Sequence, residues 1–259
     1  MLIIADNLHV LHPTIARAVE LLDPAPIMDL VRRCAAAGAQ AIDINCGPLK
    51  KDPQHHMTFL VETVQAAADL PLMLDTTNAA AMAAGLAAAR RRPIINGFSL
   101  EPVKLARMLP LAQAHQADIV GYLLHPDSRV PLEEEEMMGL ALNLFEVYCK
   151  AGMDPARLII DPVIMPLGWA DGARHNRSVL TVVRNLPDLL GTPVRTMAGL
   201  SNLASGPMPL ARKIALEQAF LPMLAAAGLT FALANVLHAP AMETARLSKL
   251  LLDDFVFTG

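Results

Sequence analysis

The sequence is poor in the residues that mark several protein classes. Among its 259 residues are three cysteines, one tryptophan, two tyrosines and seven phenylalanines, and only 18% of residues are charged. Cys34, Cys46 and Cys149 form no CxxC pair, which disfavours a disulfide scaffold and fits a reducing cytoplasm. Scarce aromatic side chains disfavour a base-stacking platform, and no Lys/Arg cluster is large enough for a nucleic-acid surface. We therefore expect no nucleic-acid partner.

Hydrophobic residues, by contrast, are abundant. They make up 54% of the chain, and the mean hydropathy is +0.39, which excludes intrinsic disorder but raises the membrane class. The longest stretch without Asp, Glu, Lys or Arg, 218–242, exceeds the roughly 20 residues of a spanning helix. Pro222, Gly228 and Pro240 interrupt it, so it reads better as a helix end, a short strand and a loop. The N-terminus has no basic leader or cleavage signal, so we expect a cytoplasmic protein without a membrane span.

Short apolar runs alternate with longer amphipathic segments along the chain. We expect strands at 2–5, 41–45, 71–75, 93–97, 118–124, 157–161, 194–199 and 230–234. We expect helices at 26–37, 55–68, 78–91, 102–115, 131–151, 176–190, 209–227 and 239–253. Alternating strands and helices indicate a parallel sheet, and eight units in this length predict one α/β domain, a (β/α)8 TIM barrel over 1–259. An open doubly wound sheet is the competing topology, but the first strand is not followed by GxGxxG.

Polar residues recur where the predicted strands end, which in a barrel is the face that carries the active site. Seven of eight strand ends carry them: Asp6-Asn7, Asp43 with Asn45, Asp75 to Asn78, Asn96, Asp161, Ser201-Asn202 and Asn235. A helix N-cap explains Asn78 best, but capping alone does not explain seven strand ends. We expect His9 and His12 in the first loop.

These side chains are carboxylates and carboxamides, with no Ser-His-Asp set and no lysine suited to a Schiff base. Such groups suit a planar heteroaromatic ligand with an amidine-like edge, such as a pterin. One aspartate can accept two hydrogen bonds from a ring N–H and its exocyclic amine. Metal binding is the rival use of carboxylates. There is no HExxH, and we expect no metal, although spacing alone leaves a metal-dependent hydrolase open.

Several segments carry a family likeness: DPAP at 23–26, AIDINCGP at 41–48, LMLDTTN at 72–78, PIIN at 93–96, LIIDPVIMP at 158–166 and GLSN at 199–202. With these segments the chain resembles the pterin-binding methyltransferases of the dihydropteroate-synthase-like superfamily. The likeness is strongest to methyltetrahydrofolate:corrinoid/iron–sulfur protein methyltransferase and to the folate domain of cobalamin-dependent methionine synthase. It extends in order over nearly the whole chain.

The resemblance implies a site and a reaction. It places Asp75, Asn96 and Asp161 on the polar edge of the pterin, and Asn202 beside the N5 nitrogen that carries the methyl group. The remaining expected binding residues are Asp43, Asn45, Gly199, Ser201 and Arg212. The methyl of methyltetrahydrofolate would pass to Co(I) of a corrinoid (cobalamin) held on a separate protein. Because a carboxamide does not titrate near neutrality, Asn202 would donate a hydrogen bond that strengthens as the nitrogen leaves, and the proton would come through water.

The chain departs from the family pattern in places. It carries Ala5-Asp6-Asn7 where relatives carry Gly-Glu-Arg, and Asn235 where they carry Asp. The loop after GLSN is longer, which makes Arg212 a provisional match to the family arginine. These changes leave the methyl acceptor open more than they affect pterin binding.

Other functions stay open at this stage. A dihydropteroate synthase would need a pyrophosphate site with a basic residue near the last strand, and no Arg stands beside Asn235. A third hypothesis is a barrel subunit that binds a pterin or a corrinoid protein without turnover. We expect a transient corrinoid-protein partner. The helices at 78–91 and 209–227 could form a homodimer interface, or they could be ordinary barrel exterior.

Overall fold

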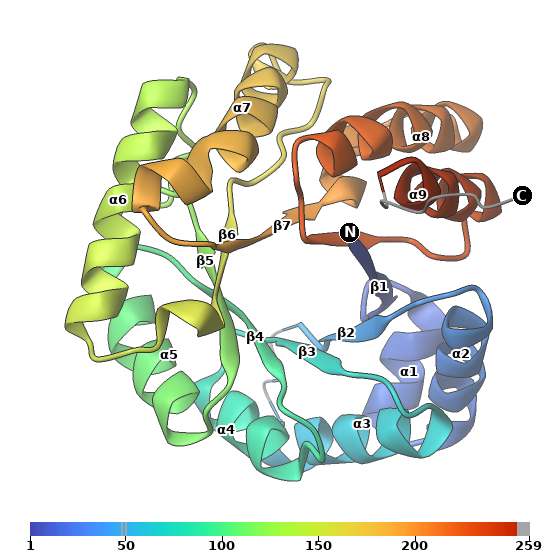
Figure 1. The fold of residues 1–259 in the computed structure, drawn as a ribbon. Helices are drawn as coiled ribbons and strands as arrows, with labels where there is room; N and C mark the ends of the chain where they lie inside the picture. The colour runs from blue at the N-terminus through green and yellow to red at the C-terminus, as the bar shows by residue number, and fades with distance from the viewer. Residues whose placement is uncertain (48, 50, 253–259) are drawn as a thin grey trace, which may run out of the picture.

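Eight parallel strands close into a barrel in the computed structural model of the chain, with helices around them (Figure 1). The strands pair in sequence order, and β1 pairs with β8 to complete the ring. The structure describes residues 1–47, 49 and 51–252. The predicted (β/α)8 barrel is confirmed, while the end of the last predicted helix, at Asp253, lies outside the described residues.

The elements follow the predicted alternation closely. The strands are β1 (Leu2–His9), β2 (Ala41–Asn45), β3 (Leu72–Asp75), β4 (Ile94–Phe98), β5 (Asp118–Tyr122), β6 (Leu158–Asp161), β7 (Arg195–Gly199) and β8 (Phe231–Ala234). The α-helices are α1 (Pro13–Leu21), α2 (Pro24–Ala36), α3 (Pro53–Ala67), α4 (Ala79–Ala88), α5 (Pro102–Ala114), α6 (Glu134–Lys150), α7 (Gly172–Leu190), α8 (Leu210–Ala226) and α9 (Ala239–Leu252). Two short 3₁₀ turns, η1 (Pro155–Arg157) and η2 (Leu200–Ala204), complete the described elements.

Two predictions about the N-terminal region were wrong. β1 continues four residues beyond Ala5, through a register irregularity between Ala5 and Leu8, so His9 ends the strand instead of lying in a loop. The helix α1 was not predicted. It is nine residues long, begins at Pro13 and buries Ile15, Ala18 and Val19, whose helical spacing was a signal present in the sequence.

The barrel interior is filled in two layers. The lower one, here the apolar layer, takes one side chain from each strand: Ile4, Ala41, Met73, Ile94, Val120, Ile159, Met197 and Phe231. Side chains alternate along a strand, so the residue two positions later also points inward. Those residues form the upper layer, here the polar floor: Asp6, Asp43, Asp75, Asn96, Tyr122, Asp161, Gly199 and Leu233. The inward-facing side chains thus change from apolar to polar within two residues along most strands, and this change positions the site.

The outward-facing strand residues pack under the helices in one large core. Strands buried on both faces account for the high apolar content. The uncharged stretch 218–242 forms the end of α8, all of β8 and the start of α9, as predicted. In the part of the chain that the structure describes, no helix is both long and apolar enough to cross a membrane.

Candidate functional site

A cavity of about 620 Å³ opens above the polar floor, at the carboxyl ends of the strands. Its volume falls within the range of small-molecule sites, roughly 300–1,000 Å³. All eight floor residues line it. Its upper wall is formed mainly by polar side chains: His9, Asn45, Ser201, Asn202, Lys213, Glu217, Asn235 and His238.

The cavity contains eight of the nine residues expected from the sequence: Asp43, Asn45, Asp75, Asn96, Asp161, Gly199, Ser201 and Asn202. The ninth, Arg212, is exposed on α8 and is not among the lining residues, whereas the neighbouring Lys213 is. The basic side chain at the cavity mouth is therefore one position further along the helix than expected.

Asp75, Asn96 and Asp161 lie on one arc of the floor, from β3 to β6. Asp75 and Asn96 are register partners on adjacent strands, as are Tyr122 and Asp161. The Tyr122 hydroxyl donates a hydrogen bond to Asn96 Oδ1. With that oxygen engaged, the amide nitrogen of Asn96 is left as a donor. This bond therefore sets which end of Asn96 can serve a ligand.

The two aspartates of this arc are also oriented. Asn45 Nδ2 donates to Asp75 Oδ2 at 2.6 Å, and the Val163 backbone N–H donates to Asp161 Oδ1 at 2.7 Å. Each carboxyl thus uses one oxygen for the protein in these bonds and keeps the other for a ligand. Such support by neighbouring groups holds recognition groups in place before a ligand arrives.

Burial controls the ionisation of the floor. Removal from water raises the pKa of Asp75 to about 6 and the pKa of Asp161 to about 7, although the Val163 hydrogen bond opposes the second shift. Burial, followed by the charges of Asp75 and Asp6, raises the pKa of Asp43 well above its ordinary value. The floor contains four carboxyl groups and no lysine or arginine, so it does not hold four full negative charges at neutral pH.

Asn202 follows the floor directly, in the 3₁₀ turn η2 after β7. Its side chain lies close against Gly199: a Cβ atom at residue 199 would be 3.2 Å from Asn202 Nδ2 and 3.7 Å from Cγ. Because Gly199 has no side chain, the amide of Asn202 can lie against the end of the strand at the cavity wall.

Next to β7 in the closed barrel, β8 and β1 are joined by side chains. Asn7 Nδ2 donates to Asn235 Oδ1 at 2.6 Å, and Asn7 Oδ1 accepts from the Val236 backbone N–H at 3.1 Å. These are two of the positions at which the sequence departs from the family pattern of Arg and Asp. The two departures are therefore in contact, and together they form a neutral amide pair.

A family model described as "Pterin binding enzyme" matches residues 14–235. The chain belongs to this pterin-binding enzyme family. It is 27% identical over 228 residues to the methylcorrinoid:tetrahydrofolate methyltransferase of Eubacterium limosum, covering 86% of this chain and 80% of that one. It is 24% identical over 219 residues to methionine synthase of Mycobacterium tuberculosis, over 80% of this chain but 18% of that protein.

Solved structures show the same fold. Dihydropteroate synthase from Xanthomonas albilineans superposes with a TM-score of 0.68 at 21% identity, over 98% of this chain and 93% of that one. The enzyme from Yersinia pestis gives a TM-score of 0.70 at 18% identity, over 96% and 92% of the two chains. At these identities the likeness supports the architecture alone.

Several cavity residues of this pterin-binding family member were not predicted. Tyr122 was missed because the predicted fifth strand ran to Leu124 and showed no Asp or Asn at its end. The available signal was its position two residues after Val120, which places both side chains on the same face of the strand. Glu217 and His238 were not assigned either. Glu217 Oε2 lies 2.9 Å from His238 Nδ1, linking α8 to the loop after β8. Among the residues that the structure describes, no three His, Cys, Asp or Glu side chains are grouped as a metal site.

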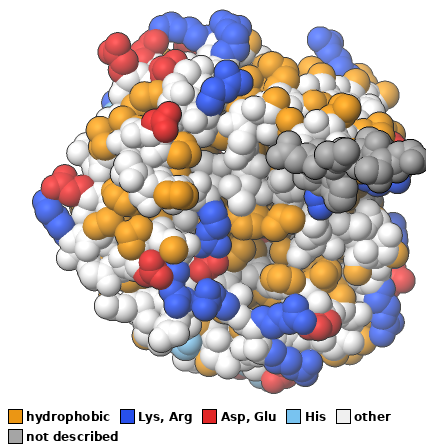
Figure 2. Space-filling view, in the orientation of Figure 1, with side chains coloured by type: hydrophobic (Ala, Val, Ile, Leu, Met, Phe, Trp, Pro, Cys, Tyr) orange, Lys and Arg blue, Asp and Glu red, His pale blue; other side chains and the backbone are white. Residues whose placement is uncertain are grey.

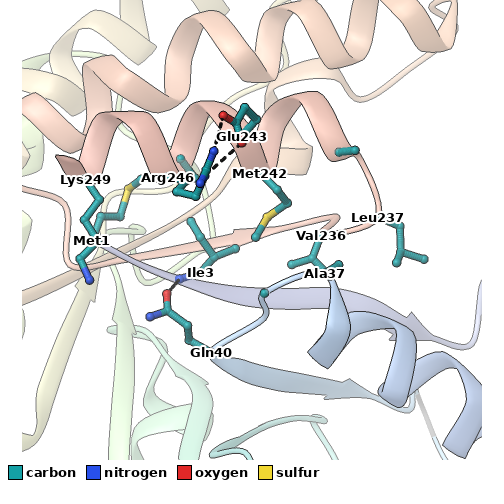
Figure 3. A pocket seen from close by; sticks show the side chains of 13 residues that line it. Met1, Ile3, Ala37, Gln40, Val236, Leu237, Met242, Glu243, Arg246 and Lys249 are labelled. Carbon is teal, nitrogen blue, oxygen red and sulfur yellow. Dashed lines mark hydrogen bonds and ion pairs between the residues drawn. The ribbon is translucent and has the colours of Figure 1, made fainter. Parts of the chain in front are cut away.

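A second cavity, of about 470 Å³, lies outside the barrel between β1 and α9 (Figure 3). Ile3, Val236 and Met242 face it, and Glu243 and Arg246 pair with each other on its α9 side. It contains none of the polar floor. On the face drawn in Figure 2, basic side chains occur in separate groups with acidic ones between them, so this face does not compete as a charged binding surface. We therefore take the cavity above the polar floor as the candidate site.

Proposed function

We propose that this protein is a methyltransferase that moves the N5 methyl group between methyltetrahydrofolate, or a related pterin, and the corrinoid of a partner protein. One observation carries the proposal. The arc of Asp75, Asn96 and Asp161 lies in the same cavity as Asn202, which stands at the end of β7. Family membership and the methyltransferase names of two relatives support it.

The arc suits the pyrimidine edge of a pterin. A carboxylate at Asp161 would accept hydrogen bonds from a ring N–H and the exocyclic amine, and the free amide nitrogen of Asn96 would donate to a ring nitrogen or carbonyl. Tyr122 holds Asn96 in that orientation. Together these groups would fix the ring plane and leave its other edge toward β7, β8 and β1.

Asn202 would act at that other edge. As the methyl group leaves, electron density grows on N5, and a hydrogen bond from the Asn202 amide would strengthen at that moment. An interaction that is stronger in the transition state than in the bound substrate raises the rate of the chemical step. Gly199 gives Asn202 the room to take this position.

Dihydropteroate synthesis is the second candidate, because the solved neighbours carry that name. That reaction needs a cationic pyrophosphate site. Lys213 is the basic residue that lines the mouth, and the pair of Glu217 and His238 stands in the same wall. No arginine stands beside Asn235 at the last strand, which favours methyl transfer. A non-catalytic pterin-binding subunit would show affinity without turnover in the experiment below.

We propose further that the corrinoid arrives on a transiently bound protein, and that the chain forms a homodimer. The outer face of α8 supports the second point. Leu210 is 61% exposed and Met223 is 48% exposed. Met223 and Phe220 line an apolar groove between α7 and α8. On α4 the outward positions Ala80 and Ala87 are small, which makes α8 the better candidate.

The deciding experiment is rapid mixing of the protein and methyltetrahydrofolate with Co(I) cobalamin, free or protein-bound, followed by the absorbance of Co(I). We expect Co(I) to be consumed and tetrahydrofolate to appear in equal amounts. If the Co(I) absorbance stays unchanged with every acceptor, the proposed function is refuted. Formation of dihydropteroate from a dihydropterin pyrophosphate and 4-aminobenzoate, measured in parallel, would favour the second candidate instead.

A further inference from the structure

The four carboxyl groups of the polar floor differ in their partners. Three accept a hydrogen bond from the protein: Asp6 from Ser201, Asp75 from Asn45 and Asp161 from Val163. Asp43 is different. It is 2% exposed and lines the cavity, and its Oδ1 atom is buried with no hydrogen-bond partner among the residues that the structure describes. An ionised carboxylate in that position would lack the donors that buried charges need.

The groups that face Asp43 oppose its ionisation. Asp6 stands beside it on β1 and Asp75 on β3, and both charges raise its pKa in the same direction as burial does. Tyr122, across the floor, is neutral, since burial raises its pKa well above the ordinary value. The floor itself contains no lysine or arginine. Of two neighbouring carboxyls, the more buried and less hydrogen-bonded one retains the shared proton, and here that one is Asp43.

The order of strands places this proton beside the Asp75 end of the pterin-binding arc, at one end of a second arc of strands. Asn96 on β4 and Asp161 on β6 face the pyrimidine edge in the proposed complex. Passing around the closed barrel from β7 through β8 and β1 leads to β2, which carries Asp43. The pyrazine edge, which includes N5, faces this second arc. Asn202 bounds the arc at one end and Asp43 at the other.

We propose that Asp43 is the acid–base residue that exchanges a proton with N5 during methyl transfer. This inference rests on the proposed function. In the direction away from folate, the electron pair of Co(I) forms the new bond to the methyl carbon while the bond from that carbon to N5 breaks. N5 keeps the electron pair of the broken bond and takes the proton of Asp43. Cobalt becomes formally Co(III), and the Asp43 carboxylate regains a proton from solvent. In the opposite direction the carboxylate accepts the proton that N5 releases.

The test compares wild type with Asp43→Asn, Asp43→Glu and Asp6→Asn, and with Asp29→Asn as a control on the exposed face of α2. Affinity for methyltetrahydrofolate is measured by titration. Methyl transfer is then measured in single turnovers with Co(I) cobalamin as a function of pH. A proton on Asp43 is detected independently as an infrared carbonyl band that wild type shows in excess of Asp43→Asn in the free protein at neutral pH, because Asp161, with a pKa of about 7, contributes its own band to both proteins.

We expect Asp43→Asn to bind methyltetrahydrofolate within about threefold of wild type and to transfer methyl at least ~100-fold more slowly, as loss of a general acid predicts. It should also lack the excess infrared band and the fall in rate at high pH that wild type shows. Asp43→Glu should recover part of the rate, while Asp29→Asn should match wild type. Wild-type transfer by Asp43→Asn, or an active wild type without the excess band, would overturn the inference. An inactive wild type that binds folate would instead refute the proposed function.

Discussion

Asn7 and Asn235 form a hydrogen bond of 2.6 Å that joins the first strand to the end of the last one. The same two amides also accept from the backbone N–H groups of Val236 and Leu237, at 3.1 and 3.0 Å. Two positions that look independent in sequence are therefore in contact, and they form a neutral amide pair at the wall of the cavity.

This pairing predicts that the two positions are energetically coupled. Asn7 is 9% exposed, so Asn7→Arg alone would bury a guanidinium without its carboxylate, and Asn235→Asp alone would add an acid beside Asp6 and Glu217. We expect each single variant to lower the free energy of unfolding by about 2 kcal/mol and the double variant to recover most of that loss. Chemical denaturation of all four proteins measures the coupling. Losses that simply add in the double variant would contradict the coupling.

Asn202→Ala tests the residue beside N5. Removal of a donor that acts mainly in the transition state should lower the single-turnover rate by roughly 100-fold. Affinity for methyltetrahydrofolate should change by only a few-fold. The matched control is Asn143→Ala, an exposed carboxamide on α6, which should leave both quantities unaltered. Unchanged turnover in folded Asn202→Ala would remove this residue from the mechanism.

Gly199→Ala tests the support of Asn202 without touching its amide. The added methyl group would stand 3.2 Å from Asn202 Nδ2, so the side chain must shift by a few tenths of an ångström. We expect the transfer rate to fall about tenfold, since one donor is misplaced rather than lost, with folate affinity nearly retained. Gly139→Ala on α6, where an added Cβ meets nothing within 4 Å, provides the control. Equal rates in both glycine variants would show that the spacing at residue 199 is unimportant.

Asp161→Asn should raise the stability of the fold while it weakens pterin binding. The pKa of Asp161 rises from 3.8 in the unfolded chain to about 7 in the fold. The native state therefore binds more protons than the unfolded state between about pH 4 and 7, and its stability falls as pH rises through that window. Each pKa unit corresponds to ~1.4 kcal/mol. Asparagine removes this loss, so the melting temperature of the variant should exceed that of wild type by a margin that grows from pH 5 to pH 8.

The same variant should bind pterin more weakly. A carboxamide cannot accept both hydrogen bonds of the pyrimidine edge, and the loss of a charge-assisted bond corresponds to an affinity lower by roughly 10- to 100-fold at pH 8. Wild-type affinity should itself rise with pH through about 7 as the carboxylate forms. Isothermal titration at pH 6 and pH 8 measures both effects, with Asp188→Asn on the exposed side of α7 as control. An unaltered folate affinity would argue against Asp161 as a pterin ligand.

Met223→Glu tests the homodimer. Met223 is 48% exposed on α8 and lines the apolar groove beside Phe220. A charge there should dissociate a dimer built on this face, and light scattering after size-exclusion chromatography should show the mass halved. Val103→Glu on α5, where the side chain is 51% exposed, is the control for an added surface charge. A wild-type protein that elutes as a monomer would refute the proposed dimer.

Much of the barrel was predictable because short apolar strands alternate with longer helices along the chain. Asp43, Asp75, Asn96 and Asp161 were predictable as well, because a polar residue at the end of an apolar strand stands out. Inward or outward direction was not predictable in the same way, since both faces of a parallel strand are apolar. Tyr122 therefore escaped notice although it completes the floor.

Other parts of the site depended on three-dimensional detail. The register irregularity in β1 carries His9 to the cavity, and no sequence signal marks it. The rotation of α8 decides between Arg212 and Lys213, and a longer loop before that helix obscures the count. The contact of Asn7 with Asn235 spans nearly the whole chain. The lack of a hydrogen-bond partner for Asp43 Oδ1 depends on the residues that surround it in the fold, and no sequence motif marks it.

The apolar layer beneath the floor has a kinetic consequence. Eight packed side chains seal the lower end of the barrel, from Ile4 on β1 to Phe231 on β8, so ligands reach the floor from the carboxyl ends of the strands. In the proposed reaction, a folate bound on the floor would lie beneath the corrinoid that approaches from the same end. Folate must then bind first and depart last, because the bound corrinoid protein blocks its exit. Steady-state kinetics should accordingly be ordered, with excess corrinoid protein slowing folate exchange in both directions.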